Sequence, residues 1–156
     1  MKKYEELLIA LRQVIRAIDL YSKKLSKETG LTSPQLLVLK AVEDHDDAMV
    51  KEVAETINLS SATITSILDR LEKRGLVTRT RSTMDKRKVG INLTVAGNEI
   101  IKDSPKPLQG HFIARFEAME KWEQSQMLAT MQKIVSMMDA QELDASPVLE
   151  VGQLHS

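Results

Sequence analysis

The chain has 156 residues, a length typical of about one domain, and its 22 basic and 22 acidic side chains give no formal net charge. A hydrophobic share of 42% and a charged share of 28% exclude disorder of the whole chain. The lack of cysteine excludes disulfides, thiolate zinc sites and cysteine nucleophiles. The sequence has no signal peptide and no apolar run near ~20 residues, so we expect a cytoplasmic protein with no membrane partner.

Two helices are predicted at the start of the chain. Apolar residues recur at three- and four-residue steps over residues 3–27, which predicts one long amphipathic helix that ends before Gly30. Ser33 as N-cap, followed by Pro34, predicts the start of a second helix, which stops in the polar run 43–47.

Shorter helices follow in the middle of the chain. Residues 50–57 show two turns of helical periodicity. A further helix is predicted to start at Ser60 or Ser61 and to run to Arg74, with Gly75 as its C-terminal cap.

A hairpin is predicted next. Residues 77–81 and 89–93 alternate as strands do, and the loop between them is polar and basic. Short helix, tight turn, second helix and basic hairpin are the layout of a winged helix-turn-helix lobe, with the helix-turn-helix at 50–74 and the wing at 76–94.

The last part of the chain is predicted to be helical with one break. A helix over 95–103 must break or kink at 104–107, because two prolines stand there, and helix then resumes to about Asp139. Periodicity disappears over 140–156, which predicts a loosely held C-terminal tail.

Positive charge gathers between Ser60 and Gly90, where eight basic and three acidic residues give a local charge of +5. Such a cluster attracts polyanions, although a solvated surface segment would show the same balance. The helix that ends at Arg74 has an apolar face and an outer face of short polar and cationic side chains, which suits the major groove of DNA. A plain core helix is the alternative. The candidate major-groove residues are Ser60, Ser61, Thr63, Thr65, Ser66, Arg70 and Lys73.

The hairpin strengthens the DNA-binding interpretation. A basic loop tip can reach into an A·T-rich minor groove, where the negative potential favours arginine, and cations on the first strand can meet phosphates. The candidate wing residues are Arg79, Arg81, Lys86, Arg87 and Lys88.

At these residues the chain resembles the MarR-type (multiple antibiotic resistance regulator) transcription factors. Residues 85–97, Asp-Lys-Arg-Lys-Val-Gly-Ile-Asn-Leu-Thr-Val-Ala-Gly, are similar to that family's wing signature of Asp-x-Arg, a five-residue interval and Leu-Thr-x-x-Gly. Residues 71–77 resemble the family's junction between recognition helix and first strand, and residues 31–35 resemble its second-helix entry. The likeness extends from about Tyr4 to Asp139.

The resemblance implies a homodimer in which the N-terminal helix and the last two helices interlock, with one winged helix from each subunit on a palindromic operator. It implies that Arg87 is the minor-groove arginine and that Asp85 positions the wing by pairing with a nearby cation. Pro105 and Pro107 depart from the family, whose members usually run a continuous helix there.

Dimerisation is also indicated by the residues themselves. The helices at 3–27 and 95–139 lie outside the short-element lobe and carry apolar stripes that must be buried, in a dimer or in an ordinary intramolecular core. The predicted fold is therefore mainly α with a small β-hairpin wing: within residues 1–139, a winged helix-turn-helix lobe plus a helical dimerisation arm, followed by the tail at 140–156. The candidate dimer residues are Leu7, Leu8, Leu11, Ile15, Met127, Met131, Ile134 and Met138.

An effector pocket is a further candidate site. Methionine and aromatic side chains adapt to varied ligands, although such residues are more often simply core. The resemblance implies small, often aromatic or anionic, molecules bound between arm and lobe. The candidate residues are Arg12, Arg16, Phe112, Phe116 and Met119.

We interpret the chain as a sequence-specific DNA-binding transcription regulator. No catalytic motif, metal-ligand spacing or cofactor loop is present, so we expect no enzyme activity, metal or cofactor. The expected partners are double-stranded DNA, a second copy of the chain and a small-molecule effector that releases a homodimeric repressor from a pseudo-palindromic operator. A ligand-independent regulator and an activator are the alternatives, as is a helical partner-binding protein, which would leave the basic wing unexplained.

Overall fold

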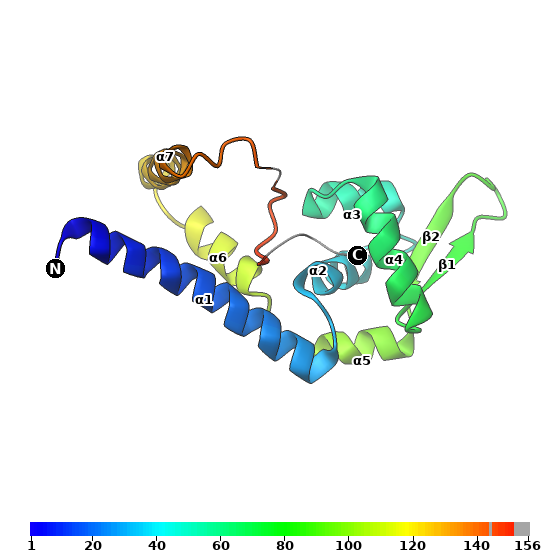
Figure 1. Ribbon diagram of the computed structural model, residues 1–156. Coiled ribbons are helices and arrows are strands. Elements are labelled where there is room, and N and C mark those ends of the chain that lie inside the picture. The colour runs from blue at the N-terminus through cyan, green and yellow to red at the C-terminus, as the bar shows by residue number, and fades with distance from the viewer. Residues whose placement is uncertain (144, 152–156) are drawn as a thin grey trace.

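The computed structural model describes residues 1–143 and 145–151 and shows an elongated molecule (Figure 1). A lobe of short helices and the hairpin lies at one end of the long first helix, whose other end carries the N-terminus. This arrangement confirms the predicted fold class, mainly α with a small β-hairpin wing. The elements are α1 (Lys3–Thr29), α2 (Ser33–Glu43), α3 (Val50–Ile57), α4 (Ser61–Lys73), β1 (Val77–Arg81), β2 (Val89–Leu93), α5 (Val95–Asp103), α6 (Leu108–Glu117) and α7 (Lys121–Met137).

The start of α2 corrects one prediction. Ser33 is the first helical residue and not the cap, because the cap is Thr32. The Thr32 hydroxyl accepts a hydrogen bond from the backbone N–H of Gln35 (3.3 Å), and the Gln35 side chain accepts one from the backbone N–H of Thr32 (3.1 Å). A cap at Ser33 would have the apolar Leu36 at the position that returns this bond, so the reciprocal pair favours Thr32.

The end of α4 turns the chain into the hairpin as predicted. Gly75 adopts the left-handed conformation (φ 73°), which residues with a Cβ adopt only at a cost in energy. Its N–H donates to the carbonyl of Glu72 (2.9 Å), and the N–H of Leu76 donates to the carbonyl of Leu71 (3.0 Å). These two bonds form a Schellman motif, which satisfies two carbonyls at the helix end.

The core lies in the lobe, where α2, α3, α4, α5 and the hairpin meet the end of α1. Each helix turns an apolar stripe inward, so that side chains from distant parts of the sequence interlock. The largest fully buried side chains are Leu25, Leu31, Leu36, Leu39, Ile64, Ile67, Leu68, Leu71, Ile91, Val38, Val53 and Val77.

The hairpin is tied to the loop that follows α2. β1 and β2 pair antiparallel with Val77 opposite Leu93, over the residues that the alternation predicted. The N–H of Ile91 donates to the carbonyl of Ala48 (2.8 Å). Asn92 exchanges two hydrogen bonds with Asp47, one from the Asp47 N–H (3.1 Å) and one to its carboxylate (2.7 Å). These bonds hold the base of the wing against the lobe.

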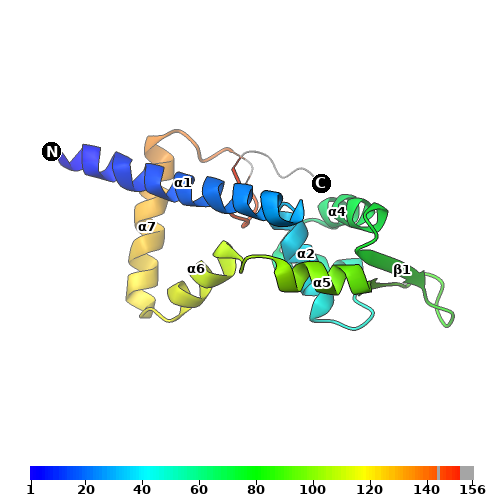
Figure 2. The same ribbon diagram turned by 90° about the horizontal axis from the view of Figure 1, so that it is seen from below.

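The arm contains one break that was predicted and one that was not. The chain leaves the helical conformation at 104–107, as the prolines require. A second break separates α6 from α7, so the helix that was predicted to resume after the prolines and to run to about Asp139 is two helices. Glu123 accepts a hydrogen bond from the N–H of Glu120 (3.0 Å) and thereby starts α7 afresh. Figure 2 shows α7 crossing α1 steeply in the half of α1 nearer the N-terminus.

Part of the predicted loose tail, residues 140–156, contacts the rest of the chain, whereas residues 144 and 152–156 of that tail lie outside the described residues. Within residues 145–151, Val148 packs against the lobe core, and Gln109 and Ser22 hydrogen-bond to the segment. Residues 145–151, called the strap below, are therefore held by hydrogen bonds and packing although they have no helical periodicity. Among the described residues, no helix combines the length and the apolar character that crossing a bilayer requires.

Candidate nucleic-acid interface

The outer face of α4 is exposed, and its inner face is fully buried. Ile64, Ile67, Leu68 and Leu71 anchor the helix in the lobe core. The candidate residues for the major groove lie on the other side, all exposed except the half-buried Thr63: Ser60, Ser61, Thr63, Thr65, Ser66, Arg70 and Lys73.

Hydroxyl groups at the start of α4 bond to the helix itself. The Ser60 hydroxyl accepts a hydrogen bond from the Thr63 N–H (3.1 Å) and shares another with the Thr63 hydroxyl (2.8 Å). The Thr65 hydroxyl donates to the carbonyl of Ser61 (2.9 Å). The Thr65 hydroxyl keeps both oxygen lone pairs for an outside donor, and the Ser60–Thr63 hydroxyl pair keeps one O–H donor and two lone pairs between its two members. Ser61 and Ser66 present small exposed side chains.

Arg79 lies across the outer edge of α4. Its Nε donates to Glu72 Oε2 (3.0 Å), and its Nη2 pairs with the carboxylate of Asp69. Hydrogen bonding from Arg79 lowers the pKa of the Glu72 carboxyl, and the two carboxylates raise the pKa of Arg79. The Arg79 guanidinium is thus held by two carboxylates and fastens β1 to α4, an arrangement that argues against the predicted phosphate contact.

The wing tip is an organised loop. The N–H of Ser82 donates to the carbonyl of Lys88 (2.8 Å), and the Lys88 N–H donates to the carbonyl of Asp85 (2.9 Å). The Ser82 hydroxyl accepts from the N–H groups of Met84 (3.2 Å) and Asp85 (3.3 Å). Arg81 braces the loop from one side, since its Nη1 donates to the carbonyl of Lys86 (3.0 Å).

Asp85 and Arg87 form the ion pair that the family resemblance implied for the wing. Asp85 Oδ1 accepts hydrogen bonds from the Arg87 N–H (3.0 Å) and from Arg87 Nε (3.2 Å). The backbone bond first, and the side-chain bond second, lower the pKa of the Asp85 carboxyl. Because the Arg87 side chain is still 91% exposed, the pair orients its guanidinium outward without covering it.

Arg74 and the Asp47–Asn92 pair are structural residues that the sequence did not single out. Arg74 donates to the carbonyls of Gly30 (3.0 Å) and Thr29 (3.0 Å), so a cation counted in the basic cluster instead closes the end of α1. No spacing rule links positions 44 or 45 residues apart, so only the fold reveals these bonds.

Two of the eight basic residues between Ser60 and Gly90, Arg74 and Arg79, therefore bond to the lobe itself. The other six remain exposed on α4 and the hairpin, which lie side by side at the end of the molecule away from the N-terminus (Figures 1 and 2). They are Arg70, Lys73, Arg81, Lys86, Arg87 and Lys88.

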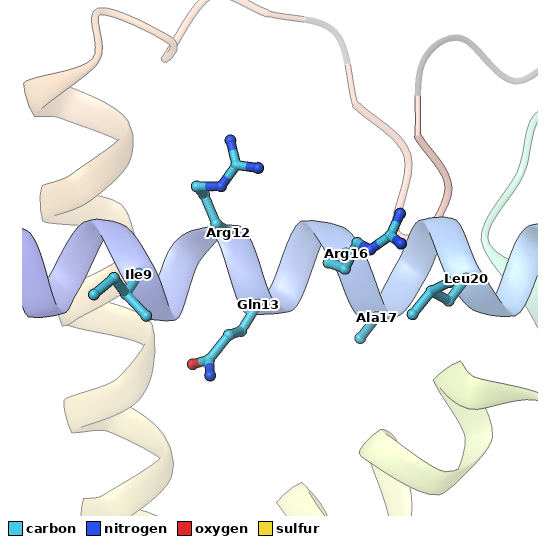
Figure 3. A pocket seen from close by; sticks show the side chains of 6 residues that line it. All are labelled: Ile9, Arg12, Gln13, Arg16, Ala17 and Leu20. Atoms are coloured by element: carbon cyan, nitrogen blue, oxygen red, sulfur yellow. The ribbon is translucent and has the colours of Figure 1, made fainter.

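The candidate effector residues fall into two groups. Arg12 and Arg16 line a shallow, open depression of about 510 Å³ whose lining residues all belong to α1 (Figure 3). Phe112 and Phe116 stack on each other along α6, with ring centroids 6.0 Å apart, and Met119 follows that helix. The single chain thus does not enclose the five residues in one pocket.

Most of the candidate dimer residues are exposed. Among the described side chains of α1 only Leu25 is buried, and α6 has none that is buried. Leu11 is half-buried. Ile134 corrects the predicted set, because it is 9% exposed and packs inside its own chain. The exposed members are Leu7, Leu8, Ile15, Met127, Met131 and Met138.

Comparison with known proteins relates this geometry to one family. The family model described as "MarR family" matches residues 31–89. The organic hydroperoxide resistance transcriptional regulator of Bacillus subtilis is 34% identical over 110 residues, which cover 70% of this chain and 74% of that protein. The regulator SarZ of Staphylococcus epidermidis is 42% identical over 74 residues, which cover 47% of this chain and 50% of SarZ, so the chain spans about half of SarZ's length.

Solved structures share the fold. A MepR-like protein complexed with pseudoligands superposes with a TM-score of 0.59 at 22% identity, over 88% of this chain and 97% of that one. The S. aureus MepR–DNA complex superposes with a TM-score of 0.58 at 19% identity, over 88% of this chain and 99% of that one.

Proposed function

The chain belongs to the MarR family, and we propose that it is a sequence-specific DNA-binding transcription regulator that acts as a homodimer on a pseudo-palindromic operator. The observation that carries the proposal is the joint surface of α4 and the wing. The apolar side of α4 is buried in the lobe core. The outer side of α4 and the wing presents small polar groups beside six exposed cations.

Affinity and specificity come from different residues in this proposal. Arg70, Lys73, Arg81 and Lys86 contact phosphates, which gives affinity that falls with salt. Short side chains on α4 approach base edges in the major groove, while Arg87 enters the minor groove and reads its width. The candidate base-reading side chains are Ser60, Ser61, Thr63, Thr65 and Ser66, with Lys88 beside Arg87 at the wing tip.

The exposed apolar side chains of the arm support a homodimer. Leu8 and Ile15 on α1, Phe112 on α6 and Met131 on α7 are all about half exposed. Exposed apolar side chains on three helices of the arm favour an interface with a second copy of the chain. Two-fold symmetry would place the two α4 helices about one DNA turn, ~34 Å, apart.

Repression by occlusion of a promoter, with release by a small ligand, is the mode of action that we favour. A ligand that binds one geometry of the dimer more tightly than the other shifts the population away from the DNA-binding form. The complex of the MepR-like protein with pseudoligands supports a ligand response, and the arm residues Arg12, Arg16, Phe112, Phe116 and Met119 remain its candidate site.

Selection of bound sites from random duplex DNA tests the proposal. The wild-type protein is expected to enrich a pseudo-palindrome, and Arg87→Ala is expected to bind it at least about tenfold more weakly while remaining folded. Arg115→Ala removes an exposed arginine from α6, away from the wing, and serves as the matched control. A folded protein that enriches no motif would contradict the proposal, as would an Arg87→Ala variant that binds like the control.

A further inference from the structure

A narrow crevice lies where the arm meets the lobe. α1 contributes Tyr21, α2 contributes Ser33 and Leu36, and the start of α6 contributes Gln109. Leu149, which belongs to the segment that returns from α7, forms a further wall. Figure 1 shows this segment running back between α6 and the lobe.

Gln109 binds the backbone of the returning segment as a neighbouring strand would. Its Nε2 donates to the carbonyl of Pro147 (2.9 Å), and its Oε1 accepts from the N–H of Leu149 (2.8 Å). One side-chain amide thus satisfies two backbone groups on residues i and i+2, which recognises an extended peptide whatever its side chains are.

Two side chains beside Leu149 add contacts with other elements. Val148 packs against the lobe core. Glu150 accepts a hydrogen bond from the Ser22 hydroxyl on α1 (3.0 Å). The segment therefore touches α1, α6 and the lobe within a few residues.

The seated segment leaves almost no free space. The remaining volume is about 10 Å³, enough for about one water molecule and far below the volume that an organic ligand needs. The Ser33 hydroxyl is buried there without a hydrogen-bond partner among the described residues, and the Tyr21 hydroxyl is buried near the backbone of Leu108. The crevice thus has apolar walls and polar groups like a binding site, and the chain itself fills it.

We propose that this crevice is a peptide-binding site occupied by residues 147–150 of the same chain, and that the seated segment braces the junction between arm and lobe. The arm joins the lobe through the turn after α1 and through the irregular stretch before α6, and the segment links both sides. Because the angle at this junction sets where α4 and the wing lie, unseating the segment changes DNA affinity. This last step rests on the proposed function.

Hydrogen exchange tests the occupancy without DNA. In the full-length protein, Leu149→Asp is expected to speed exchange of the residue 149 amide at least about tenfold, because a charge does not fit the apolar wall. Leu143→Asp is the matched control, since Leu143 is 73% exposed and lies outside the crevice. Gln109→Ala is expected to act like Leu149→Asp. Unchanged exchange in both crevice variants would overturn the proposal.

A synthetic peptide of residues 145–151 tests the crevice as a binding site. Leu149→Asp vacates it, so the wild-type peptide is expected to bind that variant with a Kd on the order of 1 mM or tighter, since a tethered segment acts at about millimolar effective concentration. The same peptide carrying Leu149→Asp is expected not to bind. Equal binding of the two peptides, or no binding, would overturn the site.

Operator affinity tests the brace. Leu149→Asp is expected to change it at least about fivefold, the usual lower end of coupling between sites, and Leu143→Asp is expected to leave it unchanged. Equal operator affinities of the Leu149→Asp and Leu143→Asp variants would overturn the proposal that the seated segment braces the junction. Should the wild-type protein bind no operator, the proposed function would fail, and exchange and peptide binding would still decide the crevice.

Discussion

Gly97 offers a sharp test of how the wing is built, because a methyl group has no room there. An added Cβ would lie 2.2 Å from the carbonyl oxygen of Leu76, which is 0.8 Å inside the 3.0 Å that real Cβ contacts respect. The opposing atom is backbone, and it also accepts a hydrogen bond from the N–H of Thr94 (3.1 Å). The start of α5 must therefore move away from the start of β1.

The expected cost follows from these contacts. Overpacking a tight site costs about 1–3 kcal/mol, and a rigid backbone neighbour places Gly97→Ala near the upper end. The gain of about 1 kcal/mol from replacing a helical glycine by alanine offsets part of this cost. We expect a net loss of about 2 kcal/mol in the free energy of unfolding, or a fall in Tm of about 4–8 °C.

Urea and thermal unfolding at one fixed protein concentration measure this loss. Gly110→Ala is the matched control, because the nearest atom to its Cβ is Pro107 Cβ at 3.9 Å, an ordinary van der Waals contact with the residue that precedes α6. It is expected to stabilise the protein by up to about 1 kcal/mol. A Gly97→Ala variant as stable as the wild type would refute the reasoning.

Three further predictions concern single contacts. The hydrogen bonds from Arg87 lower the pKa of Asp85 below its ordinary 3.8, so this pair stabilises the wing at neutral pH and is lost as the pH falls below that value. In an NMR titration the Asp85 midpoint should rise in the Arg87→Ala variant, and an unchanged midpoint would argue against the pair. Arg74→Ala removes two hydrogen bonds at the end of α1 and should lower the free energy of unfolding by about 1 kcal/mol in urea, whereas no loss would mean that water replaces them fully. Leu8→Asp should convert dimers to monomers in sedimentation equilibrium. Met84→Asp, which makes the same kind of change at an exposed apolar residue of the wing tip, is the control, and a dimeric Leu8→Asp variant would count against the arm as the interface.

Local signals predicted the lobe well because each depends on residues close in sequence. The strand alternation located both strands of the hairpin, and Gly75 marked the end of α4 because a left-handed turn needs a residue without Cβ. The cap of α2 was misplaced by one residue, since Thr32 and Ser33 are both good caps and only the partner Gln35 distinguishes them.

Long-range contacts account for what the sequence did not predict. The basic cluster looked uniform, but the fold turns Arg79 onto Asp69 and Glu72 and turns Arg74 onto the end of α1. The strap, residues 145–151, is held by the Gln109 side chain on α6 and not by helical packing, so it shows no periodicity. No local sequence pattern predicts such a partner.

Operator affinity measured at several salt concentrations, for the wild type and for Arg87→Ala, tests the central claim most directly. About eight phosphate contacts per dimer, from Arg70, Lys73, Arg81 and Lys86 in each subunit, predict a slope of log affinity against log salt on the order of −7. Arg87→Ala should bind at least about tenfold more weakly at every salt concentration. A shallow slope together with equal affinities for the two proteins would contradict the assignment of DNA binding to α4 and the wing.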